Sequence, residues 1–297
     1  MDGILVINKP SGMTSHDVVA RVRRMANQKR VGHAGTLDPM ATGVLLVCLG
    51  RATRVAEYLS GSDKTYRAVI RLGVETDTYD AEGQVTATRP VNVGEAELRN
   101  VLIQFAGEID QVPPMYSALK RDGKPLYKLA RQGIEVEREP RRVTIYGINL
   151  RAREWPDVTI DVRCSSGTYI RSLAHDIGAA LGCGAHLIEL TRVASGSFTL
   201  DDAVKLEDIG SQNVASLLRP LDAALQHLPA LALDAEQARC VMRGQAILFN
   251  ETAAWPDLFR VYDPHGTLVA IMTYNSDVRR LQPKKVLADA RERAGAV

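Results

Sequence analysis

One aspartate of this chain lies in a segment whose composition suits catalysis. Asp38 stands between Gly32 and Gly43, is followed directly by a proline, and precedes the apolar run 44–47. Glycine adopts backbone angles that other residues avoid, and proline fixes φ, so this segment is predicted to form a tight loop that enters a buried strand. A carboxylate presented on such a loop can act as a nucleophile or as a base.

A tyrosine on the next predicted strand offers an aromatic face and a hydroxyl. Residues 64–74 alternate in polarity, so that Tyr66, Ala68, Ile70 and Leu72 share one face. Tyr66 therefore lies near the start of a strand and faces inward. Its ring can lie against a flat base, although a half-buried tyrosine is also an ordinary component of a strand.

The elements that position these groups can be placed from hydrophobic periodicity and capping residues. Strands are predicted at 4–7, 44–49, 64–74, 143–150, 158–164 and 186–193, and helices at 15–25, 52–59, 96–105 and 169–181. The segment 28–30 is expected to lead directly into the Asp38 loop. Alternating strands mixed with helices predict an α+β fold.

The tail, which follows residue 229, has a separate pattern of predicted elements. A helix is predicted at 235–242, and two strands at 258–262 and 268–274 are separated by a turn at 263–266. The 297 residues are many for one compact domain, so a large domain followed by a small one is expected.

The charge of +2 is unevenly distributed. Residues 1–60 and residues 113–143 each carry eight Lys and Arg against four Asp and Glu, whereas the segment between them is acidic. Two basic blocks in a nearly neutral chain indicate a patch for a polyanion, because each cation near a phosphate releases counterions. Breakers at Pro113, Pro125 and Gly133 predict that the second block is a protruding arm with a short helix.

Several protein classes are not indicated. The four cysteines are scattered without a CxxC pair, and the six histidines lack the spacing of metal ligands, so neither disulfides nor a metal site is expected. No run approaches the roughly 20 apolar residues of a membrane span. The first residues lack the basic segment and cleavage site of a signal peptide, and a cytoplasmic location is expected.

Six segments resemble the TruB family of tRNA pseudouridine synthases. They are the Asp38 segment 32–43, NKPSG at 8–12, DKTY at 63–66, YDAEG at 79–83, PPMYSA at 113–118 and SGTYIRSL at 166–173. They occur in the family's order over about residues 3–195, and the tail after residue 229 resembles the family's small C-terminal domain. The combination is far more specific than any one segment.

The resemblance implies a fold and an activity. Residues 1–229 would form the pseudouridine synthase fold, a mixed and largely antiparallel sheet flanked by helices and loops, with residues 113–143 as an arm that contacts RNA. Residues 230–297 would form a β-rich, PUA-like RNA-binding domain. The implied reaction is isomerisation of uridine 55 in the T loop of tRNA: the base flips out, its glycosidic bond breaks, and it is rejoined to the ribose through C5.

The resemblance also assigns roles to particular residues. Asp38 would be the essential catalytic residue, and Arg171 would be the cation that keeps this carboxylate ionised in a closed pocket. Tyr66 would stack on the uracil and assist in moving the C5 proton. His33 would stack in the gap that the flipped base leaves in the RNA.

Three further residues are expected beside the pocket. Tyr169 would line it near Asp38 and Arg171, Leu190 would form an apolar wall, and Lys9 would steady the fold without reacting. The reaction oxidises nothing and transfers no group to another molecule, so no cofactor is expected. The expected partner is the T stem-loop of tRNA, and the family resemblance implies a monomer.

Other functions remain open at this point. A member of the same family could act on another RNA, as its guide-dependent relatives do, although the basic arm favours a stand-alone enzyme. A tRNA-binding or tRNA-folding protein without catalysis would not need Asp38, Tyr66 and Arg171 together. A glycoside hydrolase would need a second carboxylate, for which Asp80 in a turn is the nearest candidate. The residues also leave open whether Asp38 attacks the sugar, attacks the base or removes a ribose proton.

Overall fold

A computed structural model describes the chain except for residues 118, 122, 131, 250–256 and 289–297. Most of the chain is built on one mixed sheet with the order β14-β1-β3-β12-β4-β11-β10-β7, to which β2 is added beside β3 and β13 beside β12. Its strands are β1 Gly3–Lys9, β2 Val31–Ala34, β3 Thr42–Leu49, β4 Lys64–Leu72, β7 Gly107–Gln111, β10 Arg141–Glu154, β11 Asp157–Cys164, β12 Ala185–Ser195, β13 Phe198–Thr199 and β14 Val204–Lys205. Only the β1–β14 and β12–β3 pairs are parallel, which agrees with the largely antiparallel sheet expected.

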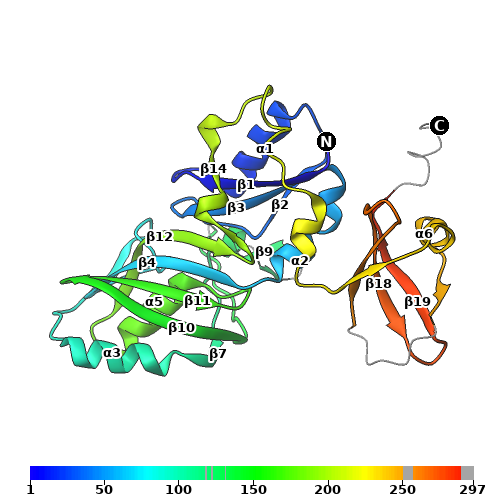
Figure 1. The fold of residues 1–297 in the computed structure, drawn as a ribbon. Helices are drawn as coiled ribbons and strands as arrows, with labels where there is room; N and C mark the ends of the chain where they lie inside the picture. Colours follow the sequence, from blue (N-terminus) through cyan, green and yellow to red (C-terminus); the bar gives the residue numbers. More distant parts are fainter. Residues whose placement is uncertain (118, 122, 131, 250–256, 289–297) are drawn as a thin grey trace.

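Helices cover this sheet where its strands are apolar. In Figure 1, α3 (Glu95–Gln104) and α5 (Ile170–Ala180) lie along one face of β4, β10 and β11, and α1 (Ser15–Met25) lies beside β1 and β2. The α1 helix begins at a capping box in which Thr14 accepts from the backbone of Asp17 and Asp17 accepts from Thr14. Its buried face packs into the main core, so the periodicity that predicted this helix is confirmed.

The β12–β4–β11 centre of the sheet joins segments that are far apart in the sequence. Tyr66 on β4 pairs with Arg192 on β12 and with Val162 on β11. The strand predicted over 64–74 ends at Leu72, and a short two-stranded sheet of β5 (Val74–Thr76) and β6 (Val85–Thr88) follows. The predicted helix 52–59 is divided into a 3-10 turn, η1 (Gly50–Arg54), and α2 (Ala56–Ser60).

The basic block 113–143 leaves the sheet after β7 and returns to it as β10. It contains the hairpin of β8 (Lys120–Arg121) and β9 (Lys124–Pro125) and the short helix α4 (Leu126–Ala130). The helix predicted between Pro125 and Gly133 is therefore present, and Gly133 adopts φ +70° after its end.

A second sheet forms the C-terminal part. Its order is β15-β17-β18-β19-β16, and α6 packs beside it. The elements are β15 Ala230–Ala232, α6 Ala235–Met242, β16 Ile247–Leu248, β17 Phe259–Tyr262, β18 Leu268–Asn275 and β19 Arg280–Val286. The predicted helix and two strands are confirmed, whereas β15, β16 and β19 were not predicted because they are short or lack a clear alternation.

The two sheets meet over a small contact (Figure 1). Two short 3-10 turns, η3 (Leu206–Asp208) and η4 (Leu221–Leu225), follow β14. Ile271 and Leu287 of the C-terminal part lie in one apolar cluster with Leu225, the last residue of η4, and with Leu228 just after it. The Tyr262 hydroxyl lies 3.2 Å from an oxygen of Asp222. Within the described part of the chain, no helix is both long and apolar enough to cross a membrane.

Candidate active site

The loop that carries Asp38 connects β2 to β3 and is fastened to α1. Ser15, the first residue of α1, donates from its hydroxyl to the Leu37 carbonyl at 3.0 Å and accepts from the Leu37 N–H at 2.8 Å. The Asp38 carbonyl accepts from the Ala41 N–H at 3.1 Å. The backbone on both sides of Asp38 is thus held, while its side chain keeps 36% of its surface accessible.

Lys9 fastens the far side of the same loop. Its ammonium is fully buried at the end of β1 and donates to the carbonyls of Pro10, Pro39 and Ala41. Burial lowers the pKa of Lys9 to about 8, and the nearby Asp38 charge opposes that shift. Lys9 therefore lies where the family resemblance placed it, and its donors are taken up by the backbone of the loop.

Arg171 meets Asp38 with both sides of its planar fork. Its Nε lies 3.0 Å from one Asp38 oxygen, and a terminal nitrogen lies 3.2 Å from the other. Arg171 stands at the start of α5 with only 5% of its side chain exposed, so it is no surface helix arginine. It also donates to the carbonyls of Thr78 and Tyr116, which fix the plane of the guanidinium.

A second carboxylate, Asp80, also binds Arg171. No role in this site was expected for Asp80 from the sequence. Its Oδ2 lies 3.2 Å from Arg171, and its side chain is 6% exposed. The Thr78 hydroxyl and the Glu82 N–H both donate to its Oδ1. A turn aspartate is common enough that its type alone predicted nothing, although the segment 79–83 was already part of the family resemblance.

The turn that carries Asp80 packs against α5 through two stacked rings. Tyr79 adopts φ +63°, which is unusual for a bulky residue. Its ring stacks on that of His175, one turn further along α5 than Arg171, with centroids 4.1 Å apart. The Tyr79 carbonyl accepts from the Leu187 N–H, which ties the turn to β12.

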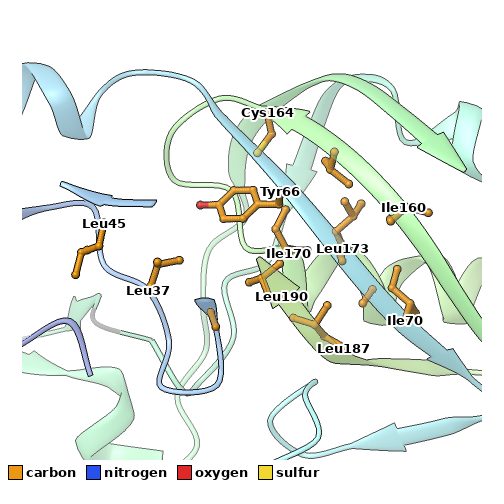
Figure 2. Close-up of a cluster of buried hydrophobic side chains, with 14 of the residues drawn as sticks. Leu37, Leu45, Tyr66, Ile70, Ile160, Cys164, Ile170, Leu173, Leu187 and Leu190 are labelled. Carbon is orange, nitrogen blue, oxygen red and sulfur yellow. The ribbon is translucent and has the colours of Figure 1, made fainter. Parts of the chain in front are cut away.

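Tyr66 faces inward from β4, as the alternation predicted. Figure 2 shows its ring among Ile170, Leu190 and Cys164, with the hydroxyl directed toward the part of the loop that carries Leu37. Burial raises the pKa of Tyr66, while the positive charge of Arg192 acts in the opposite direction. Leu190 is buried on β12 and forms part of the apolar wall around this ring.

Tyr169 directly precedes α5, and its backbone is held from β7. The Gln111 side chain accepts from the Tyr169 N–H at 2.8 Å and donates to the Tyr169 carbonyl at 3.0 Å. Burial raises the pKa of the Tyr169 hydroxyl. Gln111 was not singled out in the sequence, since a glutamine at a strand end carries no distinctive signal.

His33 lies on β2 rather than in the loop with Asp38. It pairs with Val47 on β3, and its ring meets that of His16 edge to face at 5.1 Å. Burial, with the charges of His16 and Arg192, lowers the pKa of His33 to about 4. The imidazole is therefore neutral near pH 7, which suits a ring that stacks on bases. The strand β2 was missed because its four residues include a glycine and a histidine.

The site therefore combines two carboxylates, one shared guanidinium and a buried phenol. No group of three His, Cys, Asp or Glu side chains in the described residues is arranged to hold a metal ion.

Comparisons with known proteins give the family. A family model described as TruB family pseudouridylate synthase (N terminal domain) matches residues 23–170, and one described as tRNA pseudouridylate synthase B C-terminal domain matches residues 171–226. The chain belongs to the TruB family of pseudouridine synthases.

Individual relatives agree over nearly the full length. The tRNA pseudouridine synthase B of Ralstonia pickettii (strain 12J) is 48% identical over 278 residues, covering 91% of this chain and 87% of that protein. The protein of the same name from Burkholderia mallei (strain NCTC 10247) is 48% identical over 295 residues, covering 97% of each. The one from Dehalococcoides mccartyi (strain BAV1) is 49% identical over 282 residues, covering 93% of this chain and 94% of that protein.

Solved structures show the same architecture. An H/ACA RNP bound to a substrate RNA containing 2'-deoxyuridine has a chain with a TM-score of 0.74 and 27% identity, covering 96% of this chain and 85% of its own. A chain of a Cbf5-Nop10-Gar1 complex has a TM-score of 0.74 and 29% identity, covering 97% and 86%.

Proposed function

We propose that this protein converts uridine 55 in the T loop of tRNA to pseudouridine. The observation that carries the proposal is the pairing of Asp38 with both nitrogens of the Arg171 fork, next to the inward-facing Tyr66. The family and the relatives named tRNA pseudouridine synthase B support tRNA as the substrate. The position in the T loop rests on the family resemblance.

The reaction requires from the protein a carboxylate and a pocket that holds the base. The N1–C1′ bond breaks, a C5–C1′ bond forms, C5 loses its proton and N1 gains one, so no oxidant or group donor takes part. Asp38 acts as the nucleophile or base of this sequence. Arg171 favours the charged form of that carboxylate and fixes its orientation, because a paired guanidinium offsets the penalty of partial burial.

The uracil is received by the aromatic and apolar side of the pocket. Tyr66 stacks on the base and takes part in moving the C5 proton, and Leu190 and Tyr169 close the wall around it. Extrusion of a stacked base costs a few kcal/mol, and the neutral ring of His33 replaces it in the RNA stack. Lys9 keeps the Asp38 loop in place while this happens.

The basic arm and the C-terminal sheet supply the remaining RNA surface in this proposal. Residues 1–229 are the catalytic domain, residues 113–143 within it press on the T stem-loop, and residues 230–297 form a PUA-like RNA-binding domain. The enzyme acts as a monomer in the cytoplasm without a protein partner.

An unmodified tRNA transcript tests the proposal directly. The protein is incubated with the transcript, and any pseudouridine is mapped along the RNA. We expect product at position 55, none in a transcript with cytidine at that position, and none with the Asp38→Asn variant, which still binds tRNA. Asp208→Asn, which removes an exposed carboxylate, is the matched control and should retain full activity.

Each other outcome identifies one of the alternatives. Product at a different uridine would assign the protein to another RNA target within the same family. Tight tRNA binding with no product from the unaltered protein would indicate a binding or folding role. Full turnover by Asp38→Asn would refute the role of Asp38.

A further inference from the structure

A second buried arginine, on β12, takes no part in the chemistry described so far. Arg192 is 1% exposed, and it donates from Nε to the Val44 carbonyl at 2.7 Å and from its terminal nitrogens to the carbonyls of Gly35 at 3.0 Å and Thr36 at 3.4 Å. It forms no ion pair with any carboxylate in the described part of the chain. A buried and unpaired cation is costly, so its presence needs a reason.

The backbone partners of Arg192 flank the catalytic aspartate on both sides. Gly35 and Thr36 lie just before Asp38, and Val44 lies where the loop has become β3. The close approach of β3 to Arg192 requires a glycine at position 43, whereas a side chain at position 35 would meet Arg192 at an ordinary contact distance. A Cβ on Gly35, at φ +89°, would lie 3.5 Å from an Arg192 nitrogen, and one on Gly43, at φ +98°, would lie 2.3 Å from the Arg192 carbonyl oxygen. The loop therefore rests directly on this residue.

The same guanidinium lies on the side of the sheet that carries the proposed proton acceptor. Arg192 lies opposite Tyr66 in the β12–β4 register, so the two side chains share one face of the sheet. Burial raises the pKa of Tyr66, and the positive charge of Arg192 works against this rise. Lys64, another buried cation nearby, cannot replace it, because its ammonium is occupied by the carbonyls of Leu59, Ser60 and Ser62.

We propose that Arg192 is a positioning residue that holds the Asp38 loop beside Tyr66 and favours the phenolate form of Tyr66, which accepts the C5 proton. This inference rests on the proposed function. Before the final step Tyr66 loses its hydroxyl proton to water, which the nearby Arg192 charge favours. In the final step the C5–H bond breaks, its electron pair returns to the uracil ring, and the proton joins the Tyr66 phenolate. The phenol is thereby restored, N1 takes its proton from water, and Arg192 stays cationic throughout. A fixed positive charge at a forming or reacting oxyanion needs no reorganisation during the step.

Two variants separate this role from simple support of the fold. Arg192→Lys keeps the charge but loses the fork, and Arg192→Met loses both. Arg71→Lys is the control, because Arg71 lies on the same sheet but is exposed and pairs with Asp157. Each protein is assayed on tRNA transcripts made with uridine or with uridine deuterated at C5, and its folding is checked by circular dichroism and thermal unfolding.

We expect kcat to fall about 100-fold in Arg192→Met, since a small misplacement of a reacting group has an effect of that order, with the KM for tRNA unchanged within about 3-fold. Arg192→Lys should recover part of kcat. Both variants should show a larger C5 deuterium isotope effect on kcat than the unaltered protein, because the step that involves Tyr66 becomes slower than the others. Arg71→Lys should match the unaltered protein in all three measurements.

The inference and the proposed function fail in different ways. If the unaltered protein forms no pseudouridine, the proposed function is wrong and the role of Arg192 falls with it. If the unaltered protein is active but folded Arg192→Lys shows the same kcat or an unchanged isotope effect, only the positioning role is overturned. Should Arg192→Met fail to fold, the comparison of Arg192→Lys with Arg71→Lys decides the question.

Discussion

At the scale of single residues, one guanidinium pairs with both carboxylates of the site. Arg171 lies within 3.2 Å of oxygens on both Asp38 and Asp80. Asp80 is almost fully buried and bound by two further donors, whereas Asp38 keeps over a third of its side-chain surface free. Because of this difference in exposure, Asp38 is the carboxylate that a substrate can reach, and Asp80 holds the Arg171 guanidinium in place.

Replacing Asp80 should therefore impair turnover rather than binding. We expect Asp80→Asn to lower kcat by about 10- to 100-fold, because Arg171 loses the charge that orients its fork, while tRNA affinity stays within about 3-fold. Rapid-quench assays and filter binding measure the two effects. Asp77→Asn, in the same turn but bonded to the Gln84 N–H instead of Arg171, is the control. A loss of binding that equals the loss of turnover would contradict this assignment.

The partly buried imidazole of His33 should affect the pH dependence of stability. The pKa of His33 is lowered from 6.5 to about 4 in the folded protein. Below pH 6.5 the unfolded chain takes up a proton that the folded protein does not, so this residue makes the free energy of unfolding fall as the pH drops toward 4. Above pH 6.5 the imidazole is neutral in both states and contributes no slope.

The variant His33→Phe keeps a flat ring and removes the titration. Thermal unfolding of both proteins at pH 7.5 and at pH 5 should show a smaller loss of Tm for the variant on acidification. Other titrating groups are common to both proteins and cancel in the difference. An equal loss of Tm in the two proteins would show that His33 is not buried in its neutral form.

At the scale of elements, the catalytic loop is held by polar groups that reach its backbone. Lys9 from β1, Ser15 from α1 and Arg192 from β12 each bond to carbonyls in or beside the loop. Two neighbouring elements near the N-terminus and one about 150 residues later thus position one aspartate. Buried polar groups of this kind are stable only when every donor is satisfied, which makes the loop sensitive to small changes in packing.

Gly43 and Gly12 offer a matched test of that packing. Both adopt positive φ, but a Cβ on Gly43 would overlap the backbone of Arg192, whereas one on Gly12 would meet nothing within 4 Å. We expect Gly12→Ala to lower the free energy of unfolding by about 1–2 kcal/mol from backbone strain alone. Gly43→Ala should lower it by about 1–3 kcal/mol more, because β3 must move away from β12. Equal losses in urea unfolding would show that close approach is unimportant there.

At the scale of the whole molecule, the C-terminal sheet is joined to the synthase body by a limited contact. Lys285 binds Glu57 and the Arg54 carbonyl, and lies over the ring of Tyr58. Ile271 and Leu287 add an apolar contact to the body. The polar contacts of Lys285 are separate from the hydrogen bonds that hold the Asp38 loop.

Removal of residues 230–297 should therefore separate binding from chemistry. We expect the KM for tRNA to rise at least about 10-fold while kcat stays within about 3-fold, since the groups that hold Asp38 are untouched. The salt dependence of binding should also become less steep, because fewer phosphates are neutralised. Affinity and salt slope are measured from 50 to 300 mM KCl. An unchanged affinity would refute an RNA-binding role for this part.

The sequence determined those features that depend on neighbouring residues. The start of α1, the inward face of β4 and the helix α6 followed from periodicity and capping, because such preferences act within a few residues. The segment 32–43 indicated Asp38 as the catalytic candidate through its composition and its resemblance to the motif of the TruB family. Where these local preferences were weak, as in β2 and β19, the strands were not predicted.

The tertiary structure alone decided which groups meet. Asp38, Asp80 and Arg171 come from a loop, a turn and a helix that are brought together by the order of strands in the sheet, and sequence spacing does not encode that order. Arg192 carried a faint signal, because it shares the inward face of β12 with Leu190, where a charge is out of place. Its partners could not be predicted, since they are backbone carbonyls of a loop about 150 residues away, and any residue type supplies a carbonyl.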